Sequence, residues 1–248
     1  MTARAHEARH RVETWLFATL AEAQEVEAAA ALLSDDERAR ARRFTVDGAG
    51  ARFIIAHARL RQILAAAVEL SPEAMAFEIG PRGKPILSRA RLPAGQASDP
   101  PHFNLSHAGD WAAVALCWSA PVGIDIERVR DVDLRLARRY FAPAEADAVM
   151  READAFARRL AFFRTWTAKE AYVKALGEGI AHGLERFEVA TPPGSGWSVV
   201  ATTAGAALET GRTPAHWTLS ELAAPPGYVG ALAVAAPPGD VVIVAREP

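Results

Sequence analysis

The order of helix-like and strand-like segments constrains the fold most, because the same order runs through the chain twice. In each half a helical region comes before a group of short strand patterns. We detect no sequence repeat behind this order. It predicts an α+β fold built from two similar subdomains, residues 1–120 and 121–248, in a pseudo-twofold arrangement with a ligand cleft between them.

The expected strands are short apolar runs or runs rich in β-branched and aromatic residues, bounded by turn residues. They are VETWLFATL, FNLSH, WAAVALCW, PVGIDIE, FEVA, WSVVAT, HWTLSEL and GYVGALAVA. Helices are expected at DDERARARRF, which Ser34 is placed to cap, at FIIAHARLRQILAAAVEL, and across about 134 to 176. Pro81, Gly83 and Pro85 predict a turn near the surface that presents Lys84.

Composition excludes several classes of protein. Of 248 residues, 50% are hydrophobic and 23% are charged, which is ordinary for a globular protein and argues against disorder. The net charge of -2 provides no overall field for binding nucleic acid. Cys117 is the single cysteine, so an intramolecular disulfide is impossible. The charged N-terminus leads into no long apolar run, so we expect neither a secretory signal nor a membrane span, and a cytoplasmic protein.

The first candidate site residues are Asp125 and Glu127 in GIDIE. If this segment is a strand, the two carboxylates project from one face while Ile124 and Ile126 face the core. Like charges this close raise each other's pKa unless a cation neutralises them, and carboxylate oxygens suit Mg²⁺ or a similar hard ion. A surface strand with alternating polar residues has the same pattern, so both interpretations stay open.

A second candidate is the helix TWTAKEAYVK, in which Glu170 and Lys174 lie four residues apart on one face while Lys169 is turned aside. An exposed ion pair would give the same spacing. The interpretation changes if Glu170 faces Asp125 and Glu127, because three carboxylates can hold Mg²⁺ between diphosphate oxygens. Lys169 and Lys174 would then neutralise negative charge.

The third candidate is FNLSHAGDW, where Ser106 and His107 end a strand and lead into a turn of small residues that can approach phosphate closely. His107 could donate to that phosphate. A serine next to a histidine also invites a hydrolase interpretation. However, no GxSxG elbow surrounds Ser106, and two adjacent residues rarely form a nucleophile and its base. A purely structural turn stays open as well.

Taken together and in order, LSDDERARARRF, RGKP, FNLSHAGDW, GIDIE and WTAKEAYVKALGEG resemble the 4′-phosphopantetheinyl transferase superfamily, in its long Sfp-type form whose members activate secondary-metabolite synthases. The resemblance runs from about Leu33 to Gly179 and returns weakly at GYVGALAV. It implies a monomer of two similar halves that binds coenzyme A and Mg²⁺ between them, with Mn²⁺ as an alternative metal.

The same resemblance implies roles for individual residues. Asp125, Glu127 and Glu170 match the metal-binding acids, Glu170 doubles as the base, and Lys174 lies beside the diphosphate. The residues implied to contact coenzyme A or its phosphates are Arg40, Arg52, Lys84, Ser106, His107 and Lys169. Glu37 departs from the pattern, because some close relatives carry a basic residue there, so the set of 3′-phosphate contacts stays open.

The implied reaction moves 4′-phosphopantetheine from coenzyme A to a serine of an apo acyl or peptidyl carrier protein and releases 3′,5′-ADP. The carriers would belong to polyketide, nonribosomal-peptide or fatty-acid synthases. Two other functions stay open on the residues alone: a Mg²⁺-dependent hydrolase of nucleotide diphosphates, and a coenzyme A binding protein without activity. The complete set of acids and lysine argues against the second, because binding alone does not need it.

Overall fold

The structure is a computed structural model that describes residues 10–81, 83–96, 98–177, 183–190, 198–202 and 217–247. Residues 1–9, on which the expectation of no secretory signal largely rested, lie outside these ranges. Within the described residues the chain forms α-helices and mostly antiparallel β-strands, so the predicted α+β class is confirmed.

The elements repeat in order, as the sequence predicts. The first half contains β1 (His10–Ala18), α1 (Ala23–Ala31), α2 (Asp35–Ala41), α3 (Ala49–Val68), β2 (Phe77–Ile79), β3 (Pro85–Leu87), β4 (His102–Ala108) and β5 (Trp111–Cys117). The second half contains β6 (Val122–Arg128), α4 (Arg135–Tyr140), α5 (Pro143–Arg151), α6 (Ala155–Leu176), β7 (Phe187–Ala190), β8 (Ser198–Thr202), β9 (Thr218–Glu221) and β10 (Tyr228–Val234). The chain then adds β11 (Val241–Arg246).

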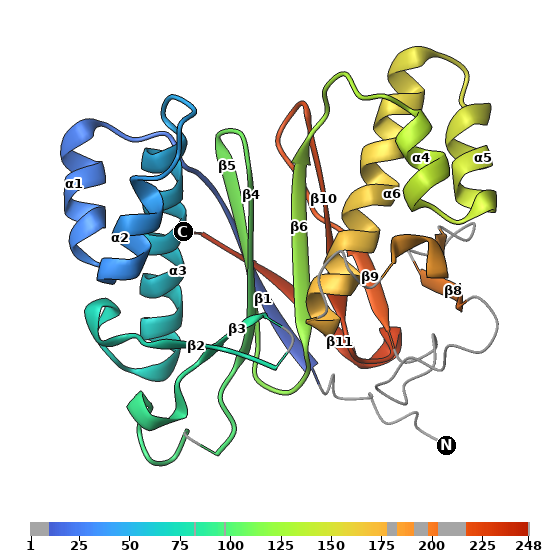
Figure 1. Cartoon of the computed structure of the whole chain (residues 1–248). Coiled ribbons are helices and arrows are strands. Elements are labelled where there is room, and N and C mark those ends of the chain that lie inside the picture. The colour runs from blue at the N-terminus through green and yellow to red at the C-terminus, as the bar shows by residue number, and fades with distance from the viewer. Residues whose placement is uncertain are drawn as a thin grey trace, which may run out of the picture.

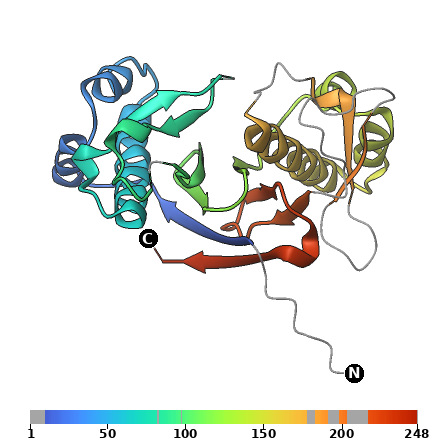
Figure 2. The same cartoon turned by 90° about the horizontal axis from the view of Figure 1, so that it is seen from below.

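Strand pairing repeats as well. The first strand of each half pairs with the last, and the last pairs with the one before it, which gives the antiparallel orders β1-β5-β4 and β6-β10-β9. Each half also has a separate hairpin, β2-β3 and β7-β8. β11 departs from the repeat, because it returns to the first half and pairs parallel with β1 (Figure 2). The boundary at residue 120 lies in the turn between β5 and β6 and stays a prediction.

The two sheets lie between the two long helices, and α3, the β4-β5 hairpin, β6 and α6 follow one another from left to right in Figure 1. The outer face of the first sheet packs on α3 through residues such as Phe17, Leu60 and Phe103. The inner faces of both sheets share a cluster that includes Val12, Ile124 and Ile126, together with Ala113, Leu232 and Val234. The prediction that Ile124 and Ile126 face the core is therefore confirmed.

An ion pair ties the helices of the first half together. Glu37 is the third residue of α2, and its carboxylate accepts the backbone N–H of Ser34 at 2.8 Å in a capping box. The same carboxylate meets the buried guanidinium of Arg61 on α3 at 2.7 Å. Arg61 also donates to the carbonyls of Pro72 and Met75, just beyond α3, at 3.1 and 2.8 Å. The pair thus fixes α2, α3 and the following loop.

The second half contains an equivalent ion pair. Glu145 is the third residue of α5, and its carboxylate accepts the backbone N–H of Ala142 at 2.8 Å. It meets the ammonium of Lys169 on α6 at 2.7 Å, and Lys169 donates to the carbonyls of Leu184 and Phe187 beyond that helix. The two halves show no visible sequence repeat, yet each contains an equivalent network. This indicates that the halves share one structural plan.

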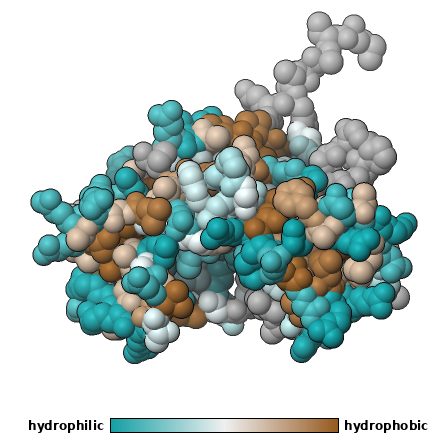
Figure 3. Space-filling view, turned by 90° about the horizontal axis from the view of Figure 1, so that it is seen from above, coloured by the Kyte–Doolittle hydropathy of each residue, from teal (hydrophilic) through white to brown (hydrophobic). Residues whose placement is uncertain are grey.

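The surface shows no single large apolar face from above: hydrophobic areas lie on both lobes and polar residues separate them (Figure 3). Exposed large apolar side chains include Phe44 and Val46, between α2 and α3, and Phe156 in the first turn of α6. Among the described residues, no helix is both long and apolar enough to cross a membrane.

Gly123 sets how closely α6 approaches β6. A Cβ atom at this position would lie 2.0 Å from the carbonyl oxygen of Ala171 and 2.4 Å from the backbone nitrogen of Ala175. The backbone of α6 therefore rests directly on the strand, and small side chains such as Ala168 and Ala231 fill the rest of this contact. The close approach brings the polar residues of α6 to those of β6.

We predict that Gly123→Ala forces α6 away from β6 and lowers the free energy of unfolding by about 3 kcal/mol, at the upper end of the usual cost of overpacking. Denaturation in urea measures this change. Gly239→Ala is the matched control, because nothing lies within 4 Å of a Cβ there. Equal stability of the two variants would contradict the close helix–strand contact.

Candidate active site

The centre of the candidate site is Asp125, whose carboxylate is buried in β6. Its Oδ1 atom accepts hydrogen bonds from Ser106 Oγ of β4 at 2.7 Å and from Lys174 Nζ of α6 at 2.6 Å. Lys174 also donates to Ser106 Oγ at 3.0 Å. The structure thus brings together predicted site residues from three elements and from both halves.

Glu170 and Glu127 lie close enough to Asp125 for its negative charge to raise their pKa values. Burial raises the pKa of Glu170 to about 7, with a further rise from Asp125 and an opposing effect of Lys174. Burial also raises the pKa of Glu127 to about 7, again assisted by Asp125, while Arg130 and Lys174 oppose the rise. The three carboxylates therefore repel one another, as the sequence predicts if Glu170 faces Asp125 and Glu127.

The buried oxygens of this cluster fit a divalent cation. Asp125 Oδ2 and Glu170 Oε1 are buried and have no hydrogen-bond partner among the described residues. An unpaired buried carboxylate oxygen is costly, and a hard cation removes both that cost and the mutual repulsion. Within the described part of the chain, no three acidic, histidine or cysteine side chains already stand at metal-binding distances. Lys174 now supplies the positive charge at Asp125.

Lys84 approaches the same centre from the β2-β3 hairpin. Its ammonium donates to the carbonyl of Val122 at the start of β6, at 2.7 Å, and its stem lies against Gly177 at the end of α6. Burial and the nearby charge of Lys174 lower the pKa of Lys84 to about 8. An anion bound between these lysines would restore the full charge of Lys84, so the predicted surface turn contributes a cation to the site.

Ser106 and His107 point in opposite directions, because neighbouring residues of a strand project from opposite faces. Ser106 lies opposite Ala113, which faces the second sheet, and His107 lies opposite Ala112, which packs on the side of α3. Ser106 binds Asp125, whereas His107 belongs to the basic side of the first half. The hydrolase interpretation of this pair is therefore excluded by geometry.

The basic side of the first half contains His107, Arg40 and Arg52. Burial and the charges of His57, Lys174 and Arg40 lower the pKa of His107, so its ring is mostly uncharged at neutral pH. Arg40 lies over the ring of Phe53. Arg52 donates to Asp110 Oδ1 in the β4-β5 turn at 2.8 Å. Arg40 thus lies within electrostatic reach of His107, and its positive charge suits an anionic ligand, whereas Arg52 is already paired with Asp110.

One sequence expectation changes in the structure, and one residue that departs from the family pattern gains a structural role. Lys169 was expected to contact the cofactor, but its side chain is fully buried and its ammonium is held by Glu145, Leu184 and Phe187. It therefore cannot meet a ligand in this arrangement and stabilises the second half instead. Glu37, which departs from the pattern that the resemblance implies, is engaged with Arg61 and His57. Burial alone would raise the pKa of Glu37, but hydrogen bonds from His57, Ser34 and Arg61 lower it to about 2.

Sequence reasoning missed Asn104. Its side-chain oxygen accepts the backbone N–H of Ile124 at 2.8 Å, next to Asp125. The available signal was its spacing, because Asn104 lies two residues before Ser106 and on the same face of β4.

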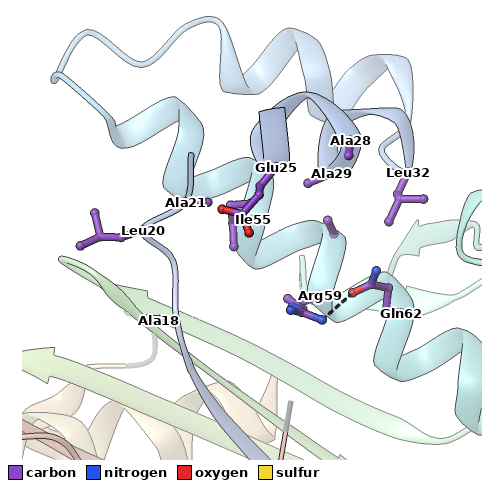
Figure 4. A pocket seen from close by; sticks show the side chains of 11 residues that line it. Ala18, Leu20, Ala21, Glu25, Ala28, Ala29, Leu32, Ile55, Arg59 and Gln62 are labelled. Atoms are coloured by element: carbon purple, nitrogen blue, oxygen red, sulfur yellow. Dashed lines mark hydrogen bonds between the residues drawn. The ribbon is translucent and has the colours of Figure 1, made fainter. Parts of the chain in front are cut away.

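A separate groove of about 330 Å³ lies in the first half between α1, the end of β1 and α3 (Figure 4). Its walls include Leu20, Ala28, Leu32 and Ile55. Figure 4 also shows Arg59 donating to Gln62 at one end of the groove. None of its lining residues belongs to the cluster around Asp125.

Comparison with known proteins gives one consistent family. A model described as the 4′-phosphopantetheinyl transferase N-terminal region matches residues 20–119, and one described as the 4′-phosphopantetheinyl transferase superfamily matches residues 121–235. The 4′-phosphopantetheinyl transferase HetI of Nostoc sp. is 39% identical over 208 residues, which cover 83% of this chain and 80% of HetI. Sfp of Bacillus subtilis is 28% identical over 218 residues, covering 87% and 88% of the two chains. Psf-1 of Bacillus pumilus is 34% identical over 164 residues, or 66% of each chain.

The raised pKa of Glu170 predicts how stability depends on pH in metal-free buffer. The folded state keeps the proton up to about pH 7, whereas the unfolded state releases it near 4.5. The folded state thus binds more protons between these values, and stability falls as pH rises. Glu170→Gln removes this loss, so its stability relative to the wild type should rise by about 1 to 3 kcal/mol between pH 4.5 and pH 8.

Urea denaturation in the presence of a chelator measures this difference at both pH values. Glu27→Gln, at an exposed position of α1, serves as the control and should show a constant difference from the wild type. A Glu170→Gln profile parallel to that of the control would show that Glu170 is not held in a repulsive, buried cluster.

Proposed function

Because the chain belongs to the 4′-phosphopantetheinyl transferase superfamily, we propose that it transfers the 4′-phosphopantetheine arm of coenzyme A to a serine of an apo carrier protein. The proposed reaction depends on Mg²⁺, with Mn²⁺ as a substitute, and releases 3′,5′-ADP. The observation that carries the proposal is the cluster of buried Asp125 and Glu170 and half-buried Glu127, with Lys174 beside it, at the boundary of the two halves.

The proposed metal ligands are Asp125, Glu127 and Glu170. The buried, unpartnered oxygens of Asp125 and Glu170 and the raised pKa values of Glu127 and Glu170 support this assignment, since each indicates a carboxylate whose oxygens are not fully paired. When bound, Mg²⁺ would neutralise the charge of the coenzyme A diphosphate.

The proposed proton acceptor is Glu170. In the reaction the serine oxygen of the carrier forms a bond to the β-phosphorus of coenzyme A, and the bond from that phosphorus to the oxygen bridging to 3′,5′-ADP breaks. The serine proton passes to Glu170, directly or through a water molecule. A carboxylate at this place is suited to the step, because aspartate and glutamate are among the side chains that serve as general bases.

Lys174 and Lys84 are proposed to bind the phosphates. Lys84 binds the carbonyl of Val122 at the start of β6, and Lys174 binds Asp125 in the middle of the same strand. Once a cation takes over at Asp125, Lys174 would be free to donate to the diphosphate and to stabilise the charge that develops on the leaving 3′,5′-ADP. Arg40, Arg52 and His107 are proposed to hold the nucleotide end, and Ser106 to orient Asp125 and Lys174.

The proposal includes a monomer that acts in the cytoplasm on carriers of polyketide, nonribosomal-peptide or fatty-acid synthases. A hydrolase of nucleotide diphosphates would use the same acids to activate water, and a coenzyme A binding protein would need no proton acceptor. Mass spectrometry separates these functions, because only a transferase adds phosphopantetheine to an apo carrier in the presence of coenzyme A and Mg²⁺. Running the assay across the three carrier classes also measures specificity.

We predict that Asp125→Ala and Glu170→Ala each lower kcat for carrier modification by at least about 100-fold, in keeping with the loss of a positioned acid or base. Circular dichroism should show that both variants stay folded. Glu27→Ala is the control and should retain full activity, because Glu27 is exposed on α1. Full activity in either Asp125→Ala or Glu170→Ala would refute the assignment of the site.

A further inference from the structure

The two halves meet at β4 and β6 without pairing through their backbones. β4 is the last strand of the order β11-β1-β5-β4, and β6 is the first of β6-β10-β9. Two side chains of β4 bridge them. Asn104 Oδ1 accepts the N–H of Ile124 at 2.8 Å, and Ser106 Oγ accepts the N–H of Ile126 at 3.3 Å.

The spacing of these bridges follows from strand geometry. In a strand, the N–H groups of successive residues point to opposite neighbours, so those of residues two apart point to the same side. β10 borders β6 on one side, so Ile124 and Ile126 present their N–H groups to the other side, toward β4. Asn104 and Ser106 are also two residues apart and share one face of β4. Their side-chain oxygens therefore take the place that backbone carbonyls occupy in a paired strand.

Asp125 lies between the two bridged amides. Its carboxylate accepts from Ser106 and Lys174, so Ser106 holds both the side chain and the following amide. Asn104 holds the preceding amide, next to Gly123, where the backbone of α6 touches the strand. If the Asn104 bridge were absent, a fully buried residue would keep an unsatisfied N–H, and β6 could shift relative to β4 and α6.

We propose that Asn104 is a positioning residue for the proposed transfer reaction: it fixes the segment of β6 that carries Asp125, and thereby the placement of the Asp125 carboxylate against Ser106 and Lys174. It acts through the strand and touches no reacting atom. The inference rests on the proposed function for its kinetic consequences, while its structural part concerns the Ile124 amide alone.

The test compares three substitutions at this position. Asn104→Leu keeps the approximate size and removes the acceptor. Asn104→Ala removes it more mildly, because water can enter, and keeps the test usable if the leucine variant does not fold. Asn104→Asp retains a side-chain oxygen at the same distance. Gln62→Leu is the matched control, since it removes an exposed amide on α3 that binds Arg59 and not β6.

Amide hydrogen exchange by NMR is the first measurement, because it does not depend on activity. Asn104→Leu and Asn104→Ala should exchange the Ile124 N–H at least roughly 10-fold faster than the wild type, as expected for one lost hydrogen bond, and Asn104→Asp should restore slow exchange. Gln62→Leu should leave exchange unchanged. Unchanged exchange of Ile124 in both acceptor-free variants would overturn the proposal.

The second measurement is steady-state carrier modification. Asn104→Leu and Asn104→Ala should lower kcat by at least about 10-fold and raise the Mg²⁺ concentration for half-maximal rate, because misplacement of a site residue is costly, while KM for the carrier stays the same. Asn104→Asp should restore most of kcat. A wild-type kcat in folded acceptor-free variants, or a loss of kcat that Asn104→Asp does not restore, would overturn the positioning role. If the wild type modified no carrier, the proposed function would fail, and exchange of Ile124 would still decide whether Asn104 holds the strand.

Discussion

The site depends on the approach of β4 to β6, where side-chain oxygens replace the carbonyls of an ordinary sheet ladder. Two edge strands in direct contact would pair through their backbones and leave no room for other groups between them. Here Asn104 and Ser106 hold β6 through side chains, so a carboxylate from β6, a hydroxyl from β4 and an ammonium from α6 can meet at one point. A polar site at this boundary is thus a consequence of how the halves are joined.

The two halves share a plan but differ in chemistry. Arg61 on α3 and Lys169 on α6 occupy equivalent places, because each pairs with the third residue of the preceding helix and donates to two carbonyls beyond its own helix. Counting from these anchors, the positions of Glu170 and Lys174 are taken in the first half by Gln62 and Ala66. The acids therefore belong to the second half, whereas the first half contributes β4, the Lys84 hairpin and the basic side chains. A site with one acidic wall and one basic wall suits a metal-bound diphosphate.

Much of this arrangement follows from local sequence pattern. Alternation in GIDIE predicts which side chains of β6 face the core, and the repeated order of segments predicts the repeated topology, because both depend on residues close in sequence. Contacts between distant segments are different. Nothing in the sequence of the hairpin around Lys84 indicates that its ammonium reaches Val122. Asn104 looks like an ordinary strand residue in the sequence, and its role appears only from its contact with β6. Lys169 shows the same limit: the helix period turns it aside from Glu170, but its burial against Glu145, Leu184 and Phe187 depends on segments distant in the chain.

The central claim is that Asp125, Glu127 and Glu170 form a divalent-cation site at the boundary of the halves. It is tested most directly by a crystal structure of the protein with coenzyme A and Mn²⁺, in which anomalous scattering locates the metal. The account predicts one strong peak at about 2.1 Å from carboxylate oxygens of these three residues and next to the diphosphate. A Mn²⁺ peak bound elsewhere, in a protein that modifies an apo carrier, would contradict it.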